Sequence, residues 1–106
     1  MKQYIYVIRP ARLEMLTKGA SEAEASIVSE HFNYLSALAK EGTVLVFGRT
    51  QNRDALTFGL CIFRAESEEA ARAVMNNDPA VKNGVMLAEL FPYEVAGFNT
   101  AGWQAE

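Results

Sequence analysis

The sequence has few of the residues from which common catalytic and structural sites are built. It contains one cysteine, Cys61, and one histidine, His31, among 106 residues. A single cysteine excludes an intrachain disulfide and fits a reducing compartment, and one cysteine with one histidine cannot supply the ligands of a structural zinc site. Cys61 lies within a strand-like segment, where we expect a small core residue and not a nucleophile. We expect no metal and no cofactor.

Basic residues, phosphate-binding motifs and long apolar runs are also scarce. Ten Lys and Arg residues stand against thirteen Asp and Glu residues, which gives a formal net charge of −3. This balance offers no basic surface to nucleic acid or anionic lipid, and no GxGxxG or Walker A pattern is present to hold nucleotide phosphates. No apolar stretch approaches the roughly 18 to 20 residues that cross a bilayer. A strand-like segment starts at once, without a signal-peptide cleavage site, so we expect a cytoplasmic protein that binds neither nucleic acid nor membrane.

Hydrophobic patterning and turn residues predict four strands and two long helices. The strands are expected at residues 3–9, 43–49, 56–64 and 85–91, and the helices at 21–42 and from 67 onwards. The segment 76–84 is dense in turn residues and is expected to be irregular. This order predicts an α+β ferredoxin-like βαββαβ fold, with an antiparallel sheet and both helices on one face. Residues 1–98 would form the domain and residues 99–106, with Trp103, a C-terminal tail.

Both faces of the predicted sheet are apolar. Alternate residues of a strand point to opposite faces, and in the second strand, for example, Val44 and Val46 alternate with Leu45 and Phe47. An antiparallel sheet with one solvated face normally alternates apolar and polar residues, and monomers seldom expose more than about 300–600 Å² of contiguous apolar surface. The helices cover one face, and a tail of eight residues is too short to cover the other. We therefore expect a homodimer that is formed through this sheet face.

The first predicted long helix carries the single histidine on its apolar side. Ser21 and Glu24 have the spacing of a capping box, and Gly42 can end the helix in the left-handed conformation. Around the helix axis, five apolar or aromatic residues lie within about 60° of His31: Ile27, Val28, Tyr34, Leu35 and Leu38. Two interpretations are open. His31 is either a hydrogen-bonded core residue, or a functional group that needs a partner and a cavity beside it.

Asp78, which precedes Pro79, is the candidate partner of His31. Aspartate before proline starts turns readily, so Asp78 could be a turn residue only. Alternatively, its carboxylate meets His31 across the helix layer. A carboxylate on one imidazole nitrogen fixes the tautomer and raises the basicity of the other nitrogen, which is how a general base is built. The spacing alone does not decide between the two.

The chain resembles the YCII-related (YciI-like) proteins over nearly its whole length. The resemblance rests on short pieces in a specific order: YIYVIR, HFNYLSALAKEG with His31, a strand ending in Gly48, then Gly59, SEEAARAVMNNDPAV with Asp78 and Pro79, and FPY near the end. It implies the dimeric α+β barrel, in which two ferredoxin-like units pack sheet to sheet. It also implies a His–Asp dyad at His31 and Asp78, with dehydrohalogenase-like or lyase-like chemistry on small compounds. Ala80 stands where the family often has an aromatic residue, and the next glycine comes later in the chain, at Gly84. Because of these two departures, the resemblance does not identify the substrate.

Together these features predict a small-molecule enzyme of the lyase, isomerase or dehydrohalogenase-like type. His31 would be the general base for proton transfer, and Asp78 would orient it. The candidate substrate contacts are Arg9, Tyr34, Arg49 and Pro79. The two arginines could bind a carboxylate or enolate oxygen, or could simply be solvated surface residues. The alternative function is a non-catalytic homodimeric module that binds a small organic ligand.

Overall fold

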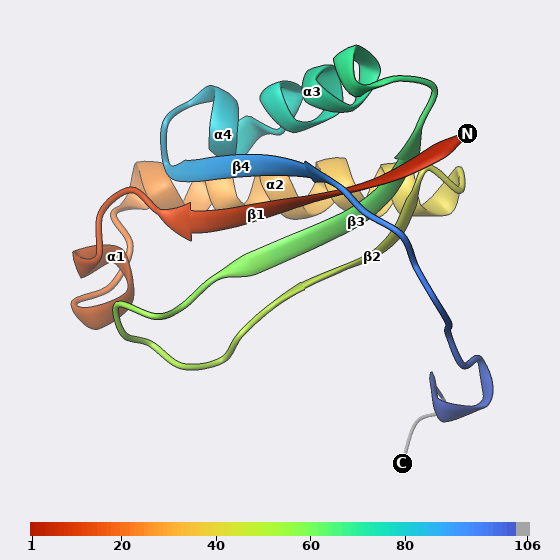
Figure 1. Cartoon of the computed structure of the whole chain (residues 1–106). Helices are drawn as coiled ribbons and strands as arrows, with labels where there is room; N and C mark the ends of the chain where they lie inside the picture. Colours follow the sequence, from red (N-terminus) through yellow and green to blue (C-terminus); the bar gives the residue numbers. More distant parts are fainter. Residues whose placement is uncertain (104–106) are drawn as a thin grey trace.

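An antiparallel sheet of four strands, covered on one face by helices, makes up most of residues 1–103, which the computed structural model describes (Figure 1). The strands are β1 (Lys2–Pro10), β2 (Val44–Arg49), β3 (Gly59–Ala65) and β4 (Met86–Pro92), in the spatial order β2-β3-β1-β4. The helices are α1 (Glu14–Thr17), α2 (Glu22–Lys40), α3 (Glu68–Asn77) and α4 (Pro79–Lys82), followed by the 3₁₀ turn η1 (Ala101–Trp103). The predicted α+β ferredoxin-like fold is confirmed. The predicted tail, 99–106, lies partly outside the described residues.

Three cross-strand rows of side chains form the helix-facing side of the sheet. The rows are Val44–Phe63–Tyr4, Phe47–Cys61–Tyr6 and Arg49–Gly59–Ile8, in the order β2, β3, β1. The first two rows are filled by aromatic and apolar groups, and Tyr6 and Phe63 are fully buried against α2 and α3. The third row has a glycine at its centre and an arginine at its edge, so this end of the sheet is less completely filled.

A β-bulge in β2 changes the faces that strict alternation predicts for this strand. The register shifts between Val44 and Val46. Val44 lies opposite Phe63 and is 3% exposed, whereas Val46 lies opposite Ile62 and is 36% exposed. The prediction that the two valines share a face was therefore wrong, because a bulge puts an extra residue into one strand and reverses the alternation beyond it.

Helix α2 begins and ends as the sequence predicts. The Ser21 hydroxyl accepts a hydrogen bond from the backbone N–H of Glu24, and the Glu24 carboxylate accepts one from the backbone N–H of Ser21, which completes the capping box. Arg12 also donates to this carboxylate, at 2.6 Å, and together these hydrogen bonds lower the pKa of Glu24 to about 2. The connector before α2 is thereby tied to its first turn. Gly42 follows the helix with a φ of 87°.

Most of the segment 76–84 is helical where an irregular chain was predicted, and for residues 76–77 and 79–82 this prediction was wrong. Helix α3 continues to Asn77, and α4 forms one further turn. The Asp78 carboxylate accepts a hydrogen bond from the backbone N–H of Ala80, and so caps α4. Pro79 occupies the first helical position, where its missing N–H costs no hydrogen bond. The turn residues of this segment therefore start a helix.

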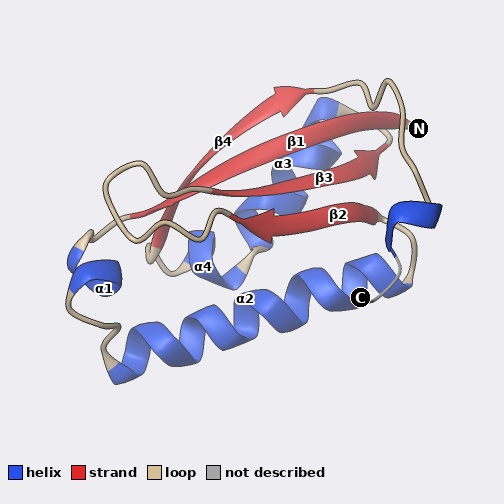
Figure 2. Cartoon of the chain, turned by 90° about the horizontal axis from the view of Figure 1, so that it is seen from below, coloured by secondary structure: helices blue, strands red, loops and turns tan. Residues whose placement is uncertain are grey.

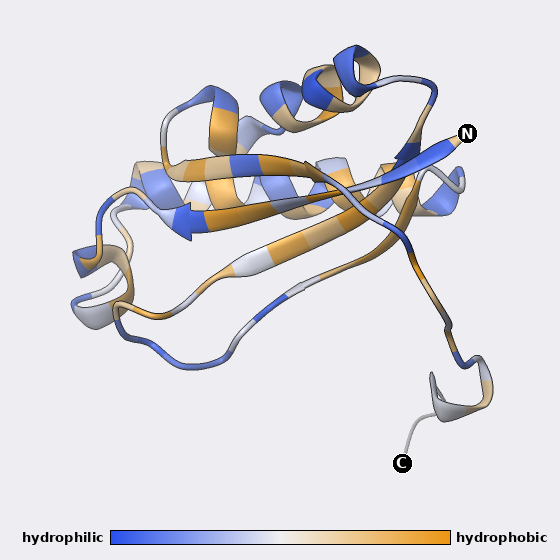
Figure 3. Cartoon of the chain, in the orientation of Figure 1, coloured by the Kyte–Doolittle hydropathy of each residue, from blue (hydrophilic) through white to orange (hydrophobic). Residues whose placement is uncertain are grey.

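The second face of the sheet lies away from α2 (Figure 2), and hydrophobic residues predominate along the strands (Figure 3). The register places on this face Ile5 and Val7 of β1, Val46 of β2, Leu60 and Ile62 of β3, and Leu87 and Phe91 of β4, together with the charged Arg9 and Glu89. Leu87 is 64% and Phe91 46% exposed. The chain after β4 runs beyond the end of the sheet (Figure 1). Within residues 1–103, no helix is long and apolar enough to cross a membrane.

Candidate active site

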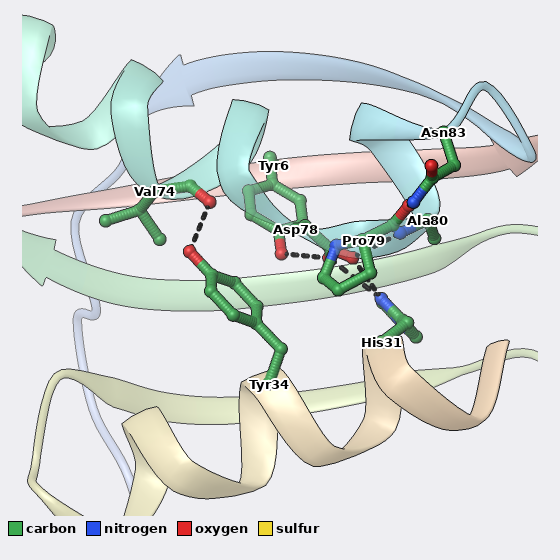
Figure 4. Close-up of polar contacts among 8 residues, drawn as sticks. All are labelled: Tyr6, His31, Tyr34, Val74, Asp78, Pro79, Ala80 and Asn83. Carbon is green, nitrogen blue, oxygen red and sulfur yellow. Dashed lines mark hydrogen bonds and ion pairs between the residues drawn. The ribbon is translucent and has the colours of Figure 1, made fainter. Parts of the chain in front are cut away.

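His31 and Asp78 meet between α2 and the α3–α4 junction, as predicted (Figure 4). The Nδ1 atom of His31 lies 2.7 Å from Oδ1 and 2.8 Å from Oδ2 of Asp78. The Asp78 side chain is fully buried, and the His31 side chain is 13% exposed. The interpretation of Asp78 as a turn residue only is therefore incomplete, since its carboxylate both caps α4 and contacts the imidazole.

The arrangement of donors around Asp78 selects one tautomer of His31. The hydroxyl of Tyr6 donates to Oδ2 at 2.6 Å, and the backbone N–H of Ala80 donates to Oδ1 at 3.0 Å. An ionised carboxylate has no proton to donate, so in this pair the proton lies on Nδ1 of His31 and points at Asp78. The lone pair is then on Nε2, the nitrogen that has to act if the ring is a base.

Tyr6 is a residue of this site that the sequence analysis missed. Its side chain lies in the middle cross-strand row and is 0% exposed. Burial raises the pKa of the phenol well above its ordinary value, so the hydroxyl stays protonated and donates to Asp78. The available signal was that a buried tyrosine usually needs a hydrogen-bond partner. In the strand YIYVIR, however, nothing distinguishes Tyr6 from the hydrophobic residues around it.

A cavity of about 610 Å³ lies between α2 and the sheet, beside His31. Its wall comes from the first half of α2, from α1, from the ends of β1, β2 and β3, and from the loop 50–58. Most of the wall is apolar, with Val28, Phe32, Leu35, Phe47 and Met86 among its residues. The volume falls in the range of small-molecule sites. The single histidine, held by Asp78, thus borders a cavity that can hold an organic ligand.

Gly59 keeps the strands close at the end of the sheet that borders this cavity. A Cβ atom there would lie 3.0 Å from Cγ1 of Ile8 and 3.2 Å from the carbonyl oxygen of Gly48. Any side chain would displace one of these neighbours or enter the cavity. Arg49 lies opposite Gly59 in the same row, so its side chain belongs to the face of the sheet on which the cavity lies.

The structure brings two of the four predicted substrate contacts to the cavity. Arg9 and Arg49 are exposed and lie among the residues that line it. The register directs the Arg49 side chain to the cavity face, whereas Arg9 lies opposite Leu87 at the end of β1 and alternates to the second face. The guanidinium carbon of Arg9 also lies 5.6 Å from the centroid of the Phe58 ring, a cation–π arrangement. Binding of a carboxylate or enolate oxygen by these arginines remains a proposal.

Tyr34 and Pro79 lie beside the dyad but, within residues 1–103, are not part of the cavity wall (Figure 4). The hydroxyl of Tyr34 donates to the carbonyl oxygen of Val74 at 2.7 Å and joins α2 to α3. Burial raises the pKa of this hydroxyl to about 12, so it stays protonated at neutral pH. Pro79 begins α4. We therefore leave both residues out of the substrate contacts proposed below.

Cys61 lies in the cavity wall as a protonated thiol. It is 0% exposed, and burial raises its pKa to about 12. A thiolate, which is the nucleophilic form, is therefore unfavourable at neutral pH. Within the described part of the chain, no three His, Cys, Asp or Glu side chains gather as a metal site would require.

The buried thiol and phenols make stability sensitive to alkaline pH. The pKa of Cys61 rises from 9.0 to about 12, and that of Tyr34 rises from 10.0 to about 12. When the pKa of a group is higher in the folded than in the unfolded state, its protonated form stabilises the fold. This stabilisation is complete at a pH below the unfolded-state pKa and is lost as the pH rises through the folded-state pKa. We expect the free energy of unfolding, measured by urea denaturation, to fall from about pH 9 upwards. In Cys61→Ala the fall should start near pH 10, and a constant value up to about pH 11 would contradict the expected protonation.

Comparisons with known proteins agree with this architecture. The family model described as the YCII-related domain matches residues 4–94. Among solved structures, the chain is similar to the 5-chloro-2-hydroxyhydroquinone dehydrochlorinase of Burkholderia phenoliruptrix, in its complex with 2,5-dihydroxybenzoquinone. The two share 20% sequence identity, the match covers 86% of this chain and 93% of that chain, and the TM-score is 0.61. A search of curated proteins gives no match. At this identity the structural likeness supports the fold alone.

Proposed function

This chain belongs to the YCII-related family, and from that premise we propose that it is an enzyme that transfers a proton on a small organic molecule. His31 is the general base, and Asp78 is the residue that orients it. The observation that carries the proposal is the hydrogen bond between Nδ1 of His31 and the buried Asp78 carboxylate, at a histidine that lines an apolar cavity. With the proton on Nδ1, the lone pair is on Nε2, and this is the nitrogen that acts as the base. A base in this setting contributes typically 10²- to 10⁴-fold to a rate.

In the proposed reaction, Nε2 of His31 takes a proton from a C–H or O–H group of the substrate. The imidazolium that forms is stabilised by the negative charge of Asp78, to which Tyr6 and the Ala80 N–H already donate. An isomerase then returns the proton to another atom of the same molecule. A lyase or dehydrohalogenase instead expels a leaving group as the C–H bonding electrons form a double bond. The structural neighbour is a dehydrochlorinase, which is consistent with the elimination.

Hydrogen–deuterium exchange tests the proposed reaction even while the product is unidentified. The protein is incubated in D₂O with a panel of small enolisable and phenolic compounds that includes 5-chloro-2-hydroxyhydroquinone, and each compound is followed by NMR. We expect deuterium incorporation, isomerisation or loss of halide for at least one compound in the presence of folded protein. A compound that binds in the cavity and never exchanges or reacts would favour the alternative, a small-ligand-binding module.

We also propose that the apolar sheet face pairs with the same face of a second copy. The support is the set of hydrophobic side chains on this face, with Val7 on the central strand β1 and Leu87 and Phe91 on the edge strand β4. Exposed apolar patches of this kind commonly mark interfaces. Light scattering after size-exclusion chromatography should give twice the mass of the chain. Val7→Glu should give the mass of one chain, and a monomeric wild type would contradict the proposal.

A further inference from the structure

The rim of the cavity carries positive charge and no negative charge. Arg49 and Arg53 line the cavity, as does Arg9 at the end of β1, whose side chain the register directs to the second face of the sheet. No Asp or Glu among residues 1–103 lines it. This local excess occurs in a chain whose formal net charge is −3. In the part of the chain that the structure describes, the ion pairs involve other basic residues: Arg12, His31 and Arg72. Unpaired guanidinium groups at the mouth of an apolar cavity attract anions and can bind a carboxylate through two parallel hydrogen bonds.

Two acidic residues on segments that flank the cavity are already engaged. Glu24, in the first turn of α2, accepts two hydrogen bonds from Arg12. Asp54, next to Arg53 in the chain, accepts hydrogen bonds from the Asn52 side chain and from the Leu56 backbone. Among the described residues, neither carboxylate forms an ion pair with Arg49 or Arg53, so these two guanidinium groups can pair with a ligand.

Arg53 is held in place before any ligand arrives. Its Nε–H donates to the carbonyl oxygen of Leu16 at 3.1 Å and so joins the loop 50–58 to α1, which lie next to each other in Figure 1. A guanidinium has five N–H donors, and this contact uses only one of them. The two terminal nitrogens remain for a ligand. A positively charged group that is fixed in advance binds with a smaller loss of conformational entropy.

The interior of the cavity suits the apolar part of such a ligand. Phe32 of α2 and Phe47 of β2 meet edge to face, with ring centroids 5.9 Å apart, and both line the cavity. An engineered protein cavity of roughly 150 Å³ holds benzene. The cavity described here is several times larger, at about 610 Å³, and therefore has room for a substituted ring.

We propose that the substrate is a small ring-bearing organic anion and that Arg53 is a specificity-determining residue, which holds the anionic group together with Arg49. The ring then lies in the apolar interior, between the arginines at the rim and His31. This inference deepens the proposed function and rests on it only for the role of His31 in the reaction.

A pair of probes that differ in charge and hardly in shape tests the proposal. Benzoate and benzamide are titrated separately into the protein, and binding is followed by NMR shifts of residues around the cavity. We expect benzoate to bind the wild type about tenfold more tightly than benzamide. Arg53→Gln should lower the affinity for benzoate about tenfold and the affinity for benzamide by less than about twofold. Arg72→Gln removes a positive charge from α3 outside the cavity wall. This control should change neither the affinity for benzoate nor the affinity for benzamide.

Arg53→Lys gives a second test if Arg53→Gln is poorly folded. It keeps the charge but loses the planar fork, so benzoate affinity should fall between those of the wild type and Arg53→Gln. The proposal is wrong if the wild type binds both probes equally, if Arg53→Gln weakens both by the same factor, or if benzoate does not bind. Because binding is measured without turnover, preference for benzoate in a protein that catalyses nothing would uphold this inference and reject the proposed reaction.

Discussion

His31→Gln should lower kcat by about 10²- to 10⁴-fold while the protein stays folded. Glutamine is uncharged, and its amide can still donate a hydrogen bond towards Asp78. It has no basic nitrogen, however, so it cannot take a proton from the substrate. The rate is measured with whichever compound reacts in the exchange assay, and folding is followed by thermal denaturation.

Glu30→Gln is the matched control for this variant. Glu30 precedes His31 in α2 and is exposed, so the same kind of side chain is introduced at the adjacent position outside the cavity wall. We expect its kcat to stay within about twofold of the wild type. If His31→Gln retains nearly full turnover, His31 is not the base. If the variant loses thermal stability and its rate is unchanged, the histidine has a structural role only.

Asp78→Ala should lower the free energy of unfolding by about 3–5 kcal/mol, because it leaves several buried hydrogen-bond donors without their acceptor. The substitution takes away the acceptor for three groups: the Tyr6 hydroxyl, the Nδ1–H of His31 and the backbone N–H of Ala80. Each buried donor without a partner costs about 1–3 kcal/mol. A domain of this size is stable by about 5–15 kcal/mol, so the loss would approach a large part of the total.

Urea denaturation followed by circular dichroism measures this loss. Glu69→Ala is a suitable control, because Glu69 is an exposed carboxylate in the first turn of α3. We expect it to lower the free energy of unfolding by only about a few tenths of a kcal/mol. The loss for Asp78→Asn should lie between those for Glu69→Ala and Asp78→Ala. The amide keeps an oxygen that can accept a hydrogen bond, but its NH₂ group is a donor where three other donors already converge. A loss below about 1 kcal/mol for Asp78→Ala would contradict the buried network.

The order of elements could be predicted because each element has a local signal, whereas Asp78 as the partner of His31 followed from the resemblance to the YCII-related proteins. The capping box of Ser21 and Glu24, together with the position of His31 on the apolar side, defined α2 and its orientation. The alternation of polar and apolar residues could not reveal the bulge after Val44, because both faces of this sheet are apolar and a shift of register leaves the pattern unchanged.

The rest of the site depends on contacts between residues far apart in the chain. Tyr6 and Asp78 are 72 positions apart, and Arg53 reaches the carbonyl of Leu16 across 37 positions. In the sequence, Tyr6 has the pattern of a core residue and Arg53 that of a solvated loop residue. Only the approach of the α3–α4 junction to β1 and of the loop 50–58 to α1 gives them partners. Asp78 and Pro79 were assigned to an irregular segment for a different reason: Asp-Pro is typical of turns, and the same pair also serves as the N-cap and first residue of a helix, as in α4.

The protonation of the two ring nitrogens of His31 provides the most direct test of a base that is oriented by Asp78. Because the chain has a single histidine, long-range ¹H–¹⁵N NMR correlations of the imidazole give one unambiguous pattern. At a pH where the ring is neutral, we predict a protonated Nδ1 and an unprotonated Nε2, since Asp78 accepts the Nδ1–H. A protonated Nε2 with the lone pair on Nδ1 would contradict this arrangement and remove His31 as the base on the cavity side.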